Sequence, residues 1–396
     1  MLSVIQLMRY VALKLRALLK NIFIRKENNM TITALPDAPS RATPSTFASK
    51  ADALIAALPG FVTEANAQAA LINAQAINGQ ASYEVGIKNG DLIGIQESGG
   101  LTWTDLGQQF SQGSIQSLCY LGNGIALAGT SLGGKILRST DYGATWSDLG
   151  RQFSQMYIRA LCYLGNGIAL AGTASSGKIL RSDDYGATWS DLGQQGAETN
   201  VFALCYCGNG IALAGAGGKI FRSINYGATW TDLGQMASEI SVQTLCYLGN
   251  GIALAGTYNG GKIFRSINYG ATWTDLGQQG AGNLIQSLCY LGNGIALAGA
   301  GGGKILRSTD YGLIWTDLGQ QFSQDTIHSL CYLGNGVALA GTWNDGKILR
   351  SIDYGATWTD LGQQGSETYI YALCYLGEGI CLAGTSATGK IYRSIY

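Results

Sequence analysis

The chain has 396 residues, of which 58 are glycine and only 4 are proline, and its formal net charge is zero at pH 7. So little proline argues against a low-complexity disordered chain, and so much glycine is typical of a fold with many tight turns. From residue 91 onward, Asp and Glu outnumber Lys and Arg. A nucleic-acid-binding surface needs clustered positive charge, so we expect no nucleic-acid partner.

Residues 1–29 are apolar, but Arg9, Lys14, Arg16 and Lys20 interrupt every run long enough to span a bilayer. No small-residue cleavage site follows, so a secretory signal is not predicted. Two interpretations of this doubtful leader stay open. It forms an interfacial amphipathic helix, or Met30 is the true start and the codons of residues 25–27 belong to a purine-rich ribosome-binding site. A membrane partner is expected only if residues 1–29 are translated.

Residues 30–90 predict a short α-helical region. A helix capped by Ser45 or Thr46 is expected to run to Leu58, and a second, alanine-rich helix to run from about Val62 to Ile77. The second helix has a thin apolar stripe and needs a bundle or a partner, unless the whole region is a linker. The pattern PSR…P-x-x-F-x-x-KADA…ALP-x-F-x-x-EANA resembles the leader of bacteriophage and prophage tail proteins, tail fibres especially. This resemblance implies attachment to phage tail or baseplate proteins through residues 30–90, and a homo-oligomer such as a trimer.

Two segments repeat through residues 91–396. One is LCYLGNGIALAG, first found at Leu118–Gly129, and the other is Lys135–Trp146, which ends in Ser-x-Asp-x-Gly-x-Thr-Trp. The second motif, called the box below, has six clear copies and a weaker one at Gln96–Trp103. Each repeat of about 40 residues holds about four strand-like runs. Seven copies predict an all-β fold: a seven-bladed β-propeller of four-stranded antiparallel blades.

The box predicts a locked turn between two strands. Its Asp or Asn can bond the backbone two residues on, its Gly supplies a positive φ, and its Trp fills apolar space under the turn. Asn replaces Asp in two copies, so charge is not required and we assign the boxes a structural role. The motif resembles the Asp-box (BNR repeat) of propellers with the sialidase-like fold, which implies the fold and not an activity. The structural positions are Asp141, Asp184, Asn225, Asn268, Asp310, Asp353, Trp146, Trp189, Trp230, Trp273, Trp315 and Trp358.

The two ends of the repeat region are complementary. The chain stops at Tyr396, midway through a box, and an unmatched outer strand, Thr102–Leu106, stands at the start of the region. We therefore expect an N-terminal strand to complete the last blade and close the ring, after a first propeller strand entered at Leu92.

Seven of the nine cysteines recur at one position per repeat. We expect small buried hydrophobes with reduced thiols, and assembly in a reducing compartment, the bacterial cytoplasm. A single histidine, His328, and the absence of a CxxC pair predict no zinc site. We expect no metal and no other cofactor.

The repeats differ in two loops and one strand. We name the strands of a repeat A to D, with A before LCYLG, B at GIALAG, C at KILRS and D after the box Trp. The D–A and B–C loops vary, and in Asp-box propellers they lie on the face opposite the C–D turn. The second and fourth residues before the Leu of strand A also vary. We expect these positions to surround the central opening on the variable-loop face and, with Trp343, to bind the ligand. The predicted ligand-binding residues are Gln116, Tyr157, Arg159, Asn200, Phe202, Gln243, Gln286, His328, Trp343, Tyr369 and Tyr371.

This mixture of amide, hydroxyl and aromatic side chains suits stacking on sugar rings and hydrogen bonding to their hydroxyls. The expected function is therefore non-catalytic: a phage tail-associated protein of the virion that binds a cell-surface glycan or another receptor. Drift at solvent-exposed positions would produce the same variability. Two other functions stay open, a glycoside hydrolase or depolymerase of the Asp-box type, and a structural propeller that binds a protein partner. The photosystem assembly factors that share Asp boxes are an example of the latter.

Catalysis has little support in the sequence. Resemblance to sialidases would imply three arginines on a substrate carboxylate, but the regular arginines lie on strand C and only Arg151 and Arg159 fall outside that register. We assign no catalytic residue. A glycosidase with two carboxylates would have to draw on the variable D–A loops. Their acidic residues are Glu198, Glu239, Asp325 and Glu367.

Overall fold

The computed structural model describes residues 102–111, 113–280, 282–386 and 388–395, together with the backbone of residues 82–88 and 91–97. The predicted helices and residues 1–29 lie outside these ranges. The chain divides into two compact units at Gly100. In the first unit, β1 (Ser82–Lys88) and β2 (Asp91–Glu97) form a two-stranded antiparallel sheet. Leu92 lies in β2 opposite Ile87, so its assignment to a propeller strand is wrong.

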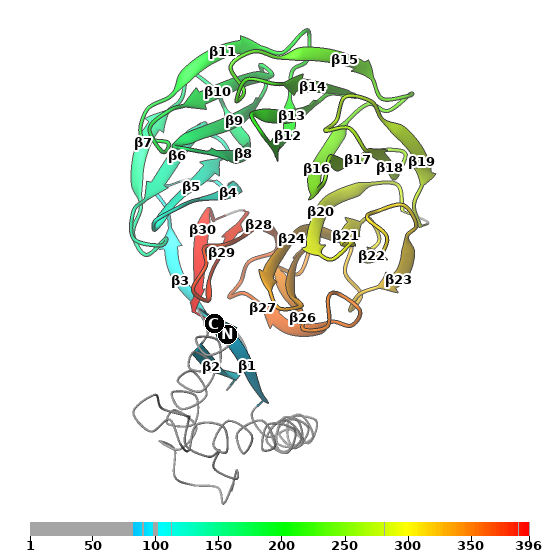
Figure 1. The fold of residues 1–396 in the computed structure, drawn as a ribbon. Helices are drawn as coiled ribbons and strands as arrows, with labels where there is room; N and C mark the ends of the chain where they lie inside the picture. Colours follow the sequence, from blue (N-terminus) through cyan, green and yellow to red (C-terminus); the bar gives the residue numbers. More distant parts are fainter. Residues whose placement is uncertain are drawn as a thin grey trace, which may run out of the picture. The chain divides into compact units, whose positions relative to one another are not determined.

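The second unit is a ring of seven four-stranded antiparallel sheets (Figure 1). The innermost strands, strand A of each blade, are β4 (Ile115–Gly122), β8 (Tyr157–Gly165), β12 (Val201–Gly208), β16 (Val242–Gly249), β20 (Ile285–Gly292), β24 (Thr326–Gly334) and β28 (Ile370–Tyr375). The B strands are β5 (Ile125–Thr130), β9 (Ile168–Ala174), β13 (Ile211–Ala216), β17 (Ile252–Thr257), β21 (Ile295–Ala300), β25 (Val337–Trp343) and β29 (Ile380–Thr385).

The C strands are β6 (Lys135–Ser139), β10 (Lys178–Ser182), β14 (Lys219–Ser223), β18 (Lys262–Ser266), β22 (Lys304–Ser308), β26 (Lys347–Ser351) and β30 (Lys390–Ile395). The outer D strands are β7 (Ser147–Arg151), β11 (Ser190–Gln194), β15 (Thr231–Gln235), β19 (Thr274–Gln278), β23 (Thr316–Gln320), β27 (Thr359–Gln363) and β3 (Trp103–Gln108). The sequence prediction of a seven-bladed β-propeller is confirmed. We number the blades from β4–β7, the first, to β28–β29–β30–β3, the seventh.

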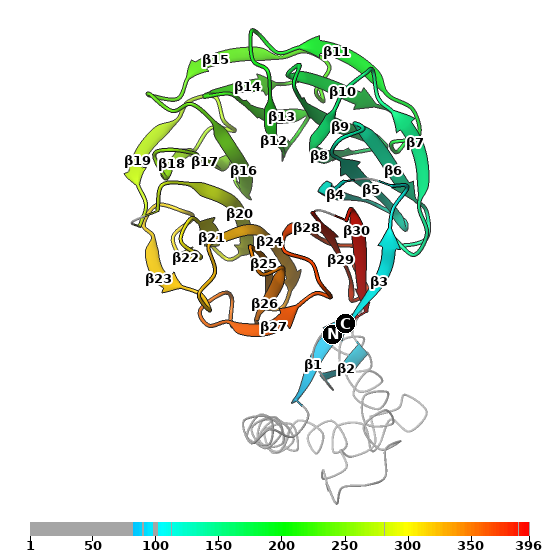
Figure 2. The same ribbon diagram turned by 180° about the vertical axis from the view of Figure 1, so that it is seen from behind.

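The ring is closed by a strand from the beginning of the domain, as predicted. β3 pairs with β30, so that Trp103 lies opposite Ser394 and Thr104 opposite Arg393. Figures 1 and 2 show β3 running along the outer edge of the seventh blade. The pairing joins the two ends of the domain and leaves no blade one strand short.

The two faces of the ring are distinguished by hydrogen bonds between turns. In the first blade the box turn meets the A–B turn, since the Tyr142 N–H donates to the Gly124 carbonyl at 2.9 Å. The B–C loop meets the D–A loop that leads into the second blade, since the Gly134 N–H donates to the Met156 carbonyl at 2.9 Å. The variable loops therefore share one face, the variable-loop face, and the box turns share the other.

The core lies between neighbouring blades, and a glycine of strand B allows their close approach. A Cβ atom on Gly129 would lie 2.6 Å from Cγ2 of Ile158, which belongs to strand A of the second blade. Ser117 in the first blade also donates its hydroxyl to the Ile158 carbonyl at 3.3 Å. This contact explains why the third residue before the strand-A Leu is always Ile or Val, and why strand B carries a glycine.

The box turn is locked by its serine as well as by its aspartate. The Gly143 N–H, two residues after Asp141, donates to Ser139 Oγ at 2.9 Å, while Asp141 Oδ1 accepts from the Thr145 N–H at 2.9 Å. The sequence predicted that the aspartate accepts from the backbone N–H two residues later. In the structure it accepts from the N–H four residues later, and the serine takes the earlier N–H. Tyr142 and Gly143 both have positive φ, at 56° and 74°. Burial acts to raise the pKa of Asp141, but the hydrogen bonds from Thr145 and Ser139 hold that pKa below its ordinary value.

Box turns also join neighbouring blades. Arg138 Nε on strand C of the first blade donates to the Tyr185 carbonyl in the second box at 2.9 Å, and six of the seven strand-C arginines make this contact with the next box. These six arginines therefore act between blades, away from the axis.

All nine cysteines are free thiols, but six of the seven in register are only half-buried. Cys205 is buried, and the other six are partly buried and pack against the cores between blades, so the expectation of small hydrophobic side chains is confirmed and that of full burial only for Cys205.

Candidate functional site

A β-bulge near the start of strand A positions the candidate site. In all seven blades the pairing of strands A and B shifts register across one residue, the second before the strand-A Leu. A bulge leaves its extra residue outside the ladder and redirects its side chain. The seven bulge residues, called the axial ring below, are Gln116, Arg159, Phe202, Gln243, Gln286, His328 and Tyr371. Strand A begins at the variable-loop face, so the axial ring lies near that face.

Neighbouring members of the axial ring touch from blade to blade. Gln286 Nε2 lies 3.3 Å from His328 Nε2, and the His328 and Tyr371 rings meet edge-on with centroids 4.6 Å apart. On β8 the Arg159 guanidinium carbon lies 5.8 Å from the Phe202 ring centroid. These contacts join side chains of three different pairs of neighbouring blades. The bulge positions therefore form part of one surface around the axis.

An aromatic cluster gathers on the sixth and seventh blades. It consists of His328, Trp343, Tyr369 and Tyr371, all half-buried. Trp343 stacks on His328 at 5.5 Å and meets Tyr369 edge-on at 4.5 Å between ring centroids. An isolated β-bridge between Trp343, at the end of β25, and Tyr369, just before β28, holds the two blades together here. The cluster offers partly exposed ring surface at the variable-loop face.

A second group lies on the second and third blades. The Arg159 guanidinium carbon is 5.8 Å from the centroid of Tyr157 and 5.8 Å from that of Phe202. Attraction to two ring faces orients the cation. The structure thus brings Tyr157, Arg159 and Phe202 together, in a group separate from the aromatic cluster.

The remaining predicted residues are less closely joined. Gln116 donates to Ser114 Oγ and Gln243 to Ser241 Oγ, each at 2.6 Å and within its own strand. Asn200 accepts from the Ser175 N–H of the preceding blade at 3.4 Å. These residues line the same face, but no contact among the described residues links them to either aromatic group.

His328 is neutral at physiological pH. Burial lowers the pKa of His328 from 6.5 to about 4, against the effect of its hydrogen bond with the Tyr371 carbonyl, and the positive charge of Arg159 lowers it further. Figure 1 shows β8, which carries Arg159, and β24, which carries His328, on opposite sides of the axis. Arg159 is then the one charged member of the axial ring.

The acidic residues of the variable loops are engaged with their own blades. Glu239 is 5 % exposed and lies 3.4 Å from Lys262, while Glu367 is 2 % exposed and lies 3.7 Å from Lys390. Glu198 lies 3.6 Å from Lys219, and Asp325 accepts a hydrogen bond from Asn344. Each lysine lies at the start of strand C in the blade that its glutamate's loop enters. Each lysine also pairs with an aspartate of strand D, so two carboxylates share one cation in each of these blades. We interpret these groups as structural ion pairs, because the lysine between the two carboxylates compensates their charge.

The described residues contain no group of three or more His, Cys, Asp or Glu side chains that could hold a metal ion. Nor do they contain a helix long and apolar enough to cross a membrane.

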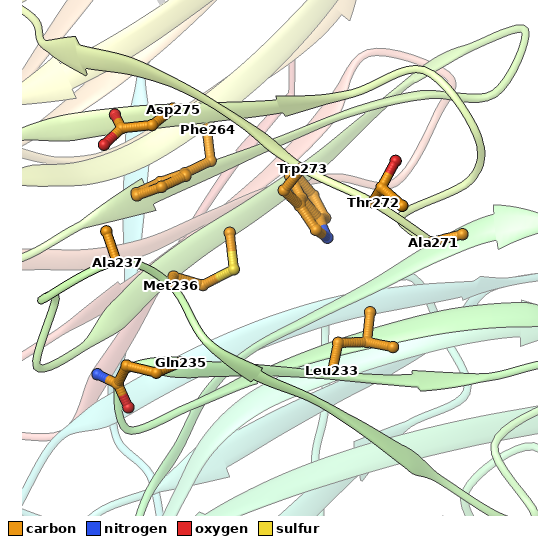
Figure 3. Close-up of a pocket in the computed structure, with 9 residues that line it drawn as sticks. All are labelled: Leu233, Gln235, Met236, Ala237, Phe264, Ala271, Thr272, Trp273 and Asp275. Atoms are coloured by element: carbon orange, nitrogen blue, oxygen red, sulfur yellow. The ribbon is translucent and has the colours of Figure 1, made fainter.

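A pocket of about 390 Å³ lies away from the axial ring, between the third and fourth blades. It is bounded by Leu233 and Met236 from one blade and by Phe264 and Trp273 from the next (Figure 3). Its polar groups already have partners, since Trp273 Nε1 donates to the Gly270 carbonyl and Asp275 pairs with Lys262. We interpret it as a gap in the packing between blades. The loop sequence GQMASEIS was the only signal for it, because Met236 and Ala237 depart there from the common GQQG.

No protein-family model matches this chain, and no curated protein matches it in sequence. Solved structures do resemble it. A streptogramin B lyase has a TM-score of 0.66 and 12 % identity over 74 % of this chain and 97 % of its own. YCF48 bound to D1 peptide has a TM-score of 0.61 and 17 % identity over 74 % and 97 %. The GH74 xyloglucanase from Xanthomonas campestris has a TM-score of 0.60 and 17 % identity over 74 % of this chain but only 53 % of its own.

These neighbours have unlike activities: two are enzymes and one binds a peptide. At identities this low the likeness concerns the fold alone. The chain is similar to them as a seven-bladed β-propeller.

Proposed function

We propose that the protein binds a ligand without catalysis at the variable-loop face, and that this ligand is a glycan on a cell surface. The observation that carries the proposal is the aromatic cluster. Four rings from two blades present partly exposed faces and edges at one end of the ring. Stacking of sugar rings on aromatic side chains needs such a surface, and the neighbouring amides of Gln286 and Gln116 can bond hydroxyl groups.

The arrangement favours binding over hydrolysis. A glycosidase of the two-carboxylate kind needs its carboxyl groups on either side of one glycosidic bond. Glu239 and Glu367 are buried, and each shares a lysine with a strand-D aspartate, so these carboxylates are occupied by ion pairs within the blade. Incubation with a polysaccharide that the protein binds should therefore leave the chain length of the polysaccharide unchanged.

We further propose a place in the virion, as a tail component assembled in the bacterial cytoplasm. The support is the leader pattern of residues 30–90, which resembles phage tail proteins. Attachment to tail or baseplate proteins would hold several copies together, and weak sites on several copies would add through avidity. An antibody against the protein should decorate the tails of particles released by the host. Decoration of host cells but not of particles would contradict this part of the proposal.

A glycan array tests the binding function. Wild-type protein should bind a defined subset of oligosaccharides, and Tyr371→Ala should lose that binding while folding normally. The matched control is Ile224→Ala, because Ile224 is 68 % exposed on the opposite, box-turn face. Equal binding by Tyr371→Ala would rule out the aromatic cluster as the site. An empty array together with stable capture of one protein partner would favour a protein ligand instead, as in the peptide-bound YCF48 structure.

A further inference from the structure

The axial ring is uniform in charge except at one blade. Three of its members are glutamines, three are aromatic rings with His328 counted among them, and the remaining member is Arg159. Burial keeps His328 neutral near pH 7, through a pKa of about 4. A ligand that reaches the axis therefore meets a single formal charge, which is positive.

The Arg159 side chain is held so that its donors stay available. The guanidinium carbon lies over the Tyr157 ring and over the Phe202 ring, 5.8 Å from each centroid, where the ring faces attract the cation. Attraction to a ring face is not a conventional hydrogen bond, so it leaves the five N–H donors of the guanidinium without an acceptor. Among the described residues, no carboxylate lies within ion-pair distance of Arg159 and its guanidinium makes no hydrogen bond to protein.

The neighbouring negative charges do not cancel this positive charge. Glu198 pairs with Lys219 and Asp325 bonds to Asn344, both on the loops outside the axial ring. Arg151, the other arginine outside the strand-C register, donates to the carbonyl oxygens of Ser154 and Gln155 in its own loop. Arg159 is thus unlike Arg151 in having its donors unoccupied by the chain.

We infer that the glycan bound at the axial ring is acidic, with a carboxylate or phosphate group bound by Arg159 while a sugar ring packs on the aromatic cluster. A planar fork of donors matches both anions in a bidentate arrangement. The inference rests on the proposed function, since it names the class of glycan for the same site. It adds that the anionic group, and not the sugar ring alone, decides which glycans bind.

The test is an array that carries carboxylated, phosphorylated and neutral oligosaccharides, probed with two matched variants. Arg159→Gln places at this bulge the residue that the first, fourth and fifth blades already have, so the variant should fold. Arg151→Gln is the control: it removes the same charge from the neighbouring first blade, at the end of β7 on the variable-loop face, where Gln194, Gln235, Gln278, Gln320 and Gln363 stand in other blades. Thermal unfolding of both variants confirms that the propeller is intact.

We expect wild type and Arg151→Gln to bind only acidic oligosaccharides, and Arg159→Gln to bind them at least tenfold more weakly, a loss of about 1.4 kcal/mol. The carboxylated and phosphorylated sets show which anion is preferred. Equal binding of neutral oligosaccharides, or unchanged affinity in Arg159→Gln, would overturn the inference and leave the glycan-binding function standing. No binding to any oligosaccharide would overturn both.

A matched ligand gives a second, independent readout when the preferred sugar is carboxylated. Reduction of its carboxylate to a primary alcohol keeps the sugar ring and removes the charge. Wild type should lose at least tenfold in affinity for the reduced sugar, whereas Arg159→Gln should bind both forms equally. If the loss is the same in both proteins, the carboxylate acts elsewhere and Arg159 is not its partner.

Discussion

His328 Nδ1 lies 3.2 Å from the carbonyl oxygen of Tyr371, so the bulges of the sixth and seventh blades are joined directly. Because the chain contains a single histidine, its ring protons report on this contact alone. Burial lowers the pKa of His328 to about 4. A proton NMR titration of the untagged protein should give a midpoint near that value. A midpoint near the ordinary 6.5 would show that the ring is solvated and that the aromatic cluster is not packed as described.

The same group predicts how stability depends on pH. The folded state lowers the pKa of His328, so protons bind more readily to the unfolded chain. The corresponding stability is fully present above pH 6.5 and is lost as the pH falls through about 4. The free energy of unfolding measured by chemical denaturation should therefore be lower at pH 5 than at pH 7. His328→Gln, which copies the fifth blade, should reduce this difference, and an unchanged difference would assign it to other groups.

The box aspartates predict a separate effect at lower pH. Hydrogen bonds outweigh burial and hold the pKa of Asp141 below 3.8, so its contribution to stability is lost as the pH falls below that value. Asp141→Asn should unfold like wild type at pH 7, because Asn225 makes the same backbone bond to Thr229 at 2.9 Å. Asp141→Ala should lose about 1 kcal/mol. Equal losses in Asn and Ala variants at pH 7 would show that the charge itself matters.

Close packing between blades predicts a contrast between two glycines. A Cβ atom on Gly172 would lie 2.7 Å from Cγ1 of Val201, so Gly172→Ala should destabilise the propeller by about 2 kcal/mol. A Cβ atom on Gly301 would lie 3.4 Å from Leu284, an ordinary contact, so Gly301→Ala should be nearly neutral. Thermal unfolding of the two variants measures the difference. Similar melting temperatures would contradict the close packing of strand B in one blade against strand A in the next.

Two tryptophans should separate folding from binding. Trp358, in the sixth box, is 9 % exposed and packs with Leu349 between blades, so Trp358→Ala should cost about 3 kcal/mol. Trp343 contacts the aromatic cluster at the variable-loop face, so Trp343→Ala should cost about 1 kcal/mol. Unfolding measurements give both values. Only Trp343→Ala should lower glycan affinity at a temperature where both variants are folded.

Repetition made the fold predictable from the sequence. The seven copies of the box indicated seven blades, and the unmatched outer strand Thr102–Leu106 indicated how the ring closes. The prediction that Leu92 enters the first propeller strand was wrong, because this residue has no counterpart in the repeats. Leu92 precedes the repeats, and its alternating neighbours suit any β-strand, so nothing distinguished the separate hairpin of β1 and β2 from a first blade strand.

The candidate site was predictable in its residues but not in its geometry. Variation at the second position before the strand-A Leu pointed to His328 and Tyr371, and the structure shows a β-bulge at both residues as the physical reason. The residue at the bulge differs from blade to blade, so no repeated residue in the sequence marks the position of the bulge. The pairing of Trp343 with Tyr369 depends on a bridge between blades, which local sequence cannot reveal.

The proposed ligand binds at the axial ring on the variable-loop face, next to His328. The most direct measurement follows the ring-proton signal of His328 while the oligosaccharide that gives the strongest array signal is added. We expect a saturable shift of that signal, with the same affinity as that measured for binding, and no such shift in Tyr371→Ala. A His328 signal that stays unchanged while the oligosaccharide saturates the protein would place the ligand elsewhere and rule out binding at the axial ring.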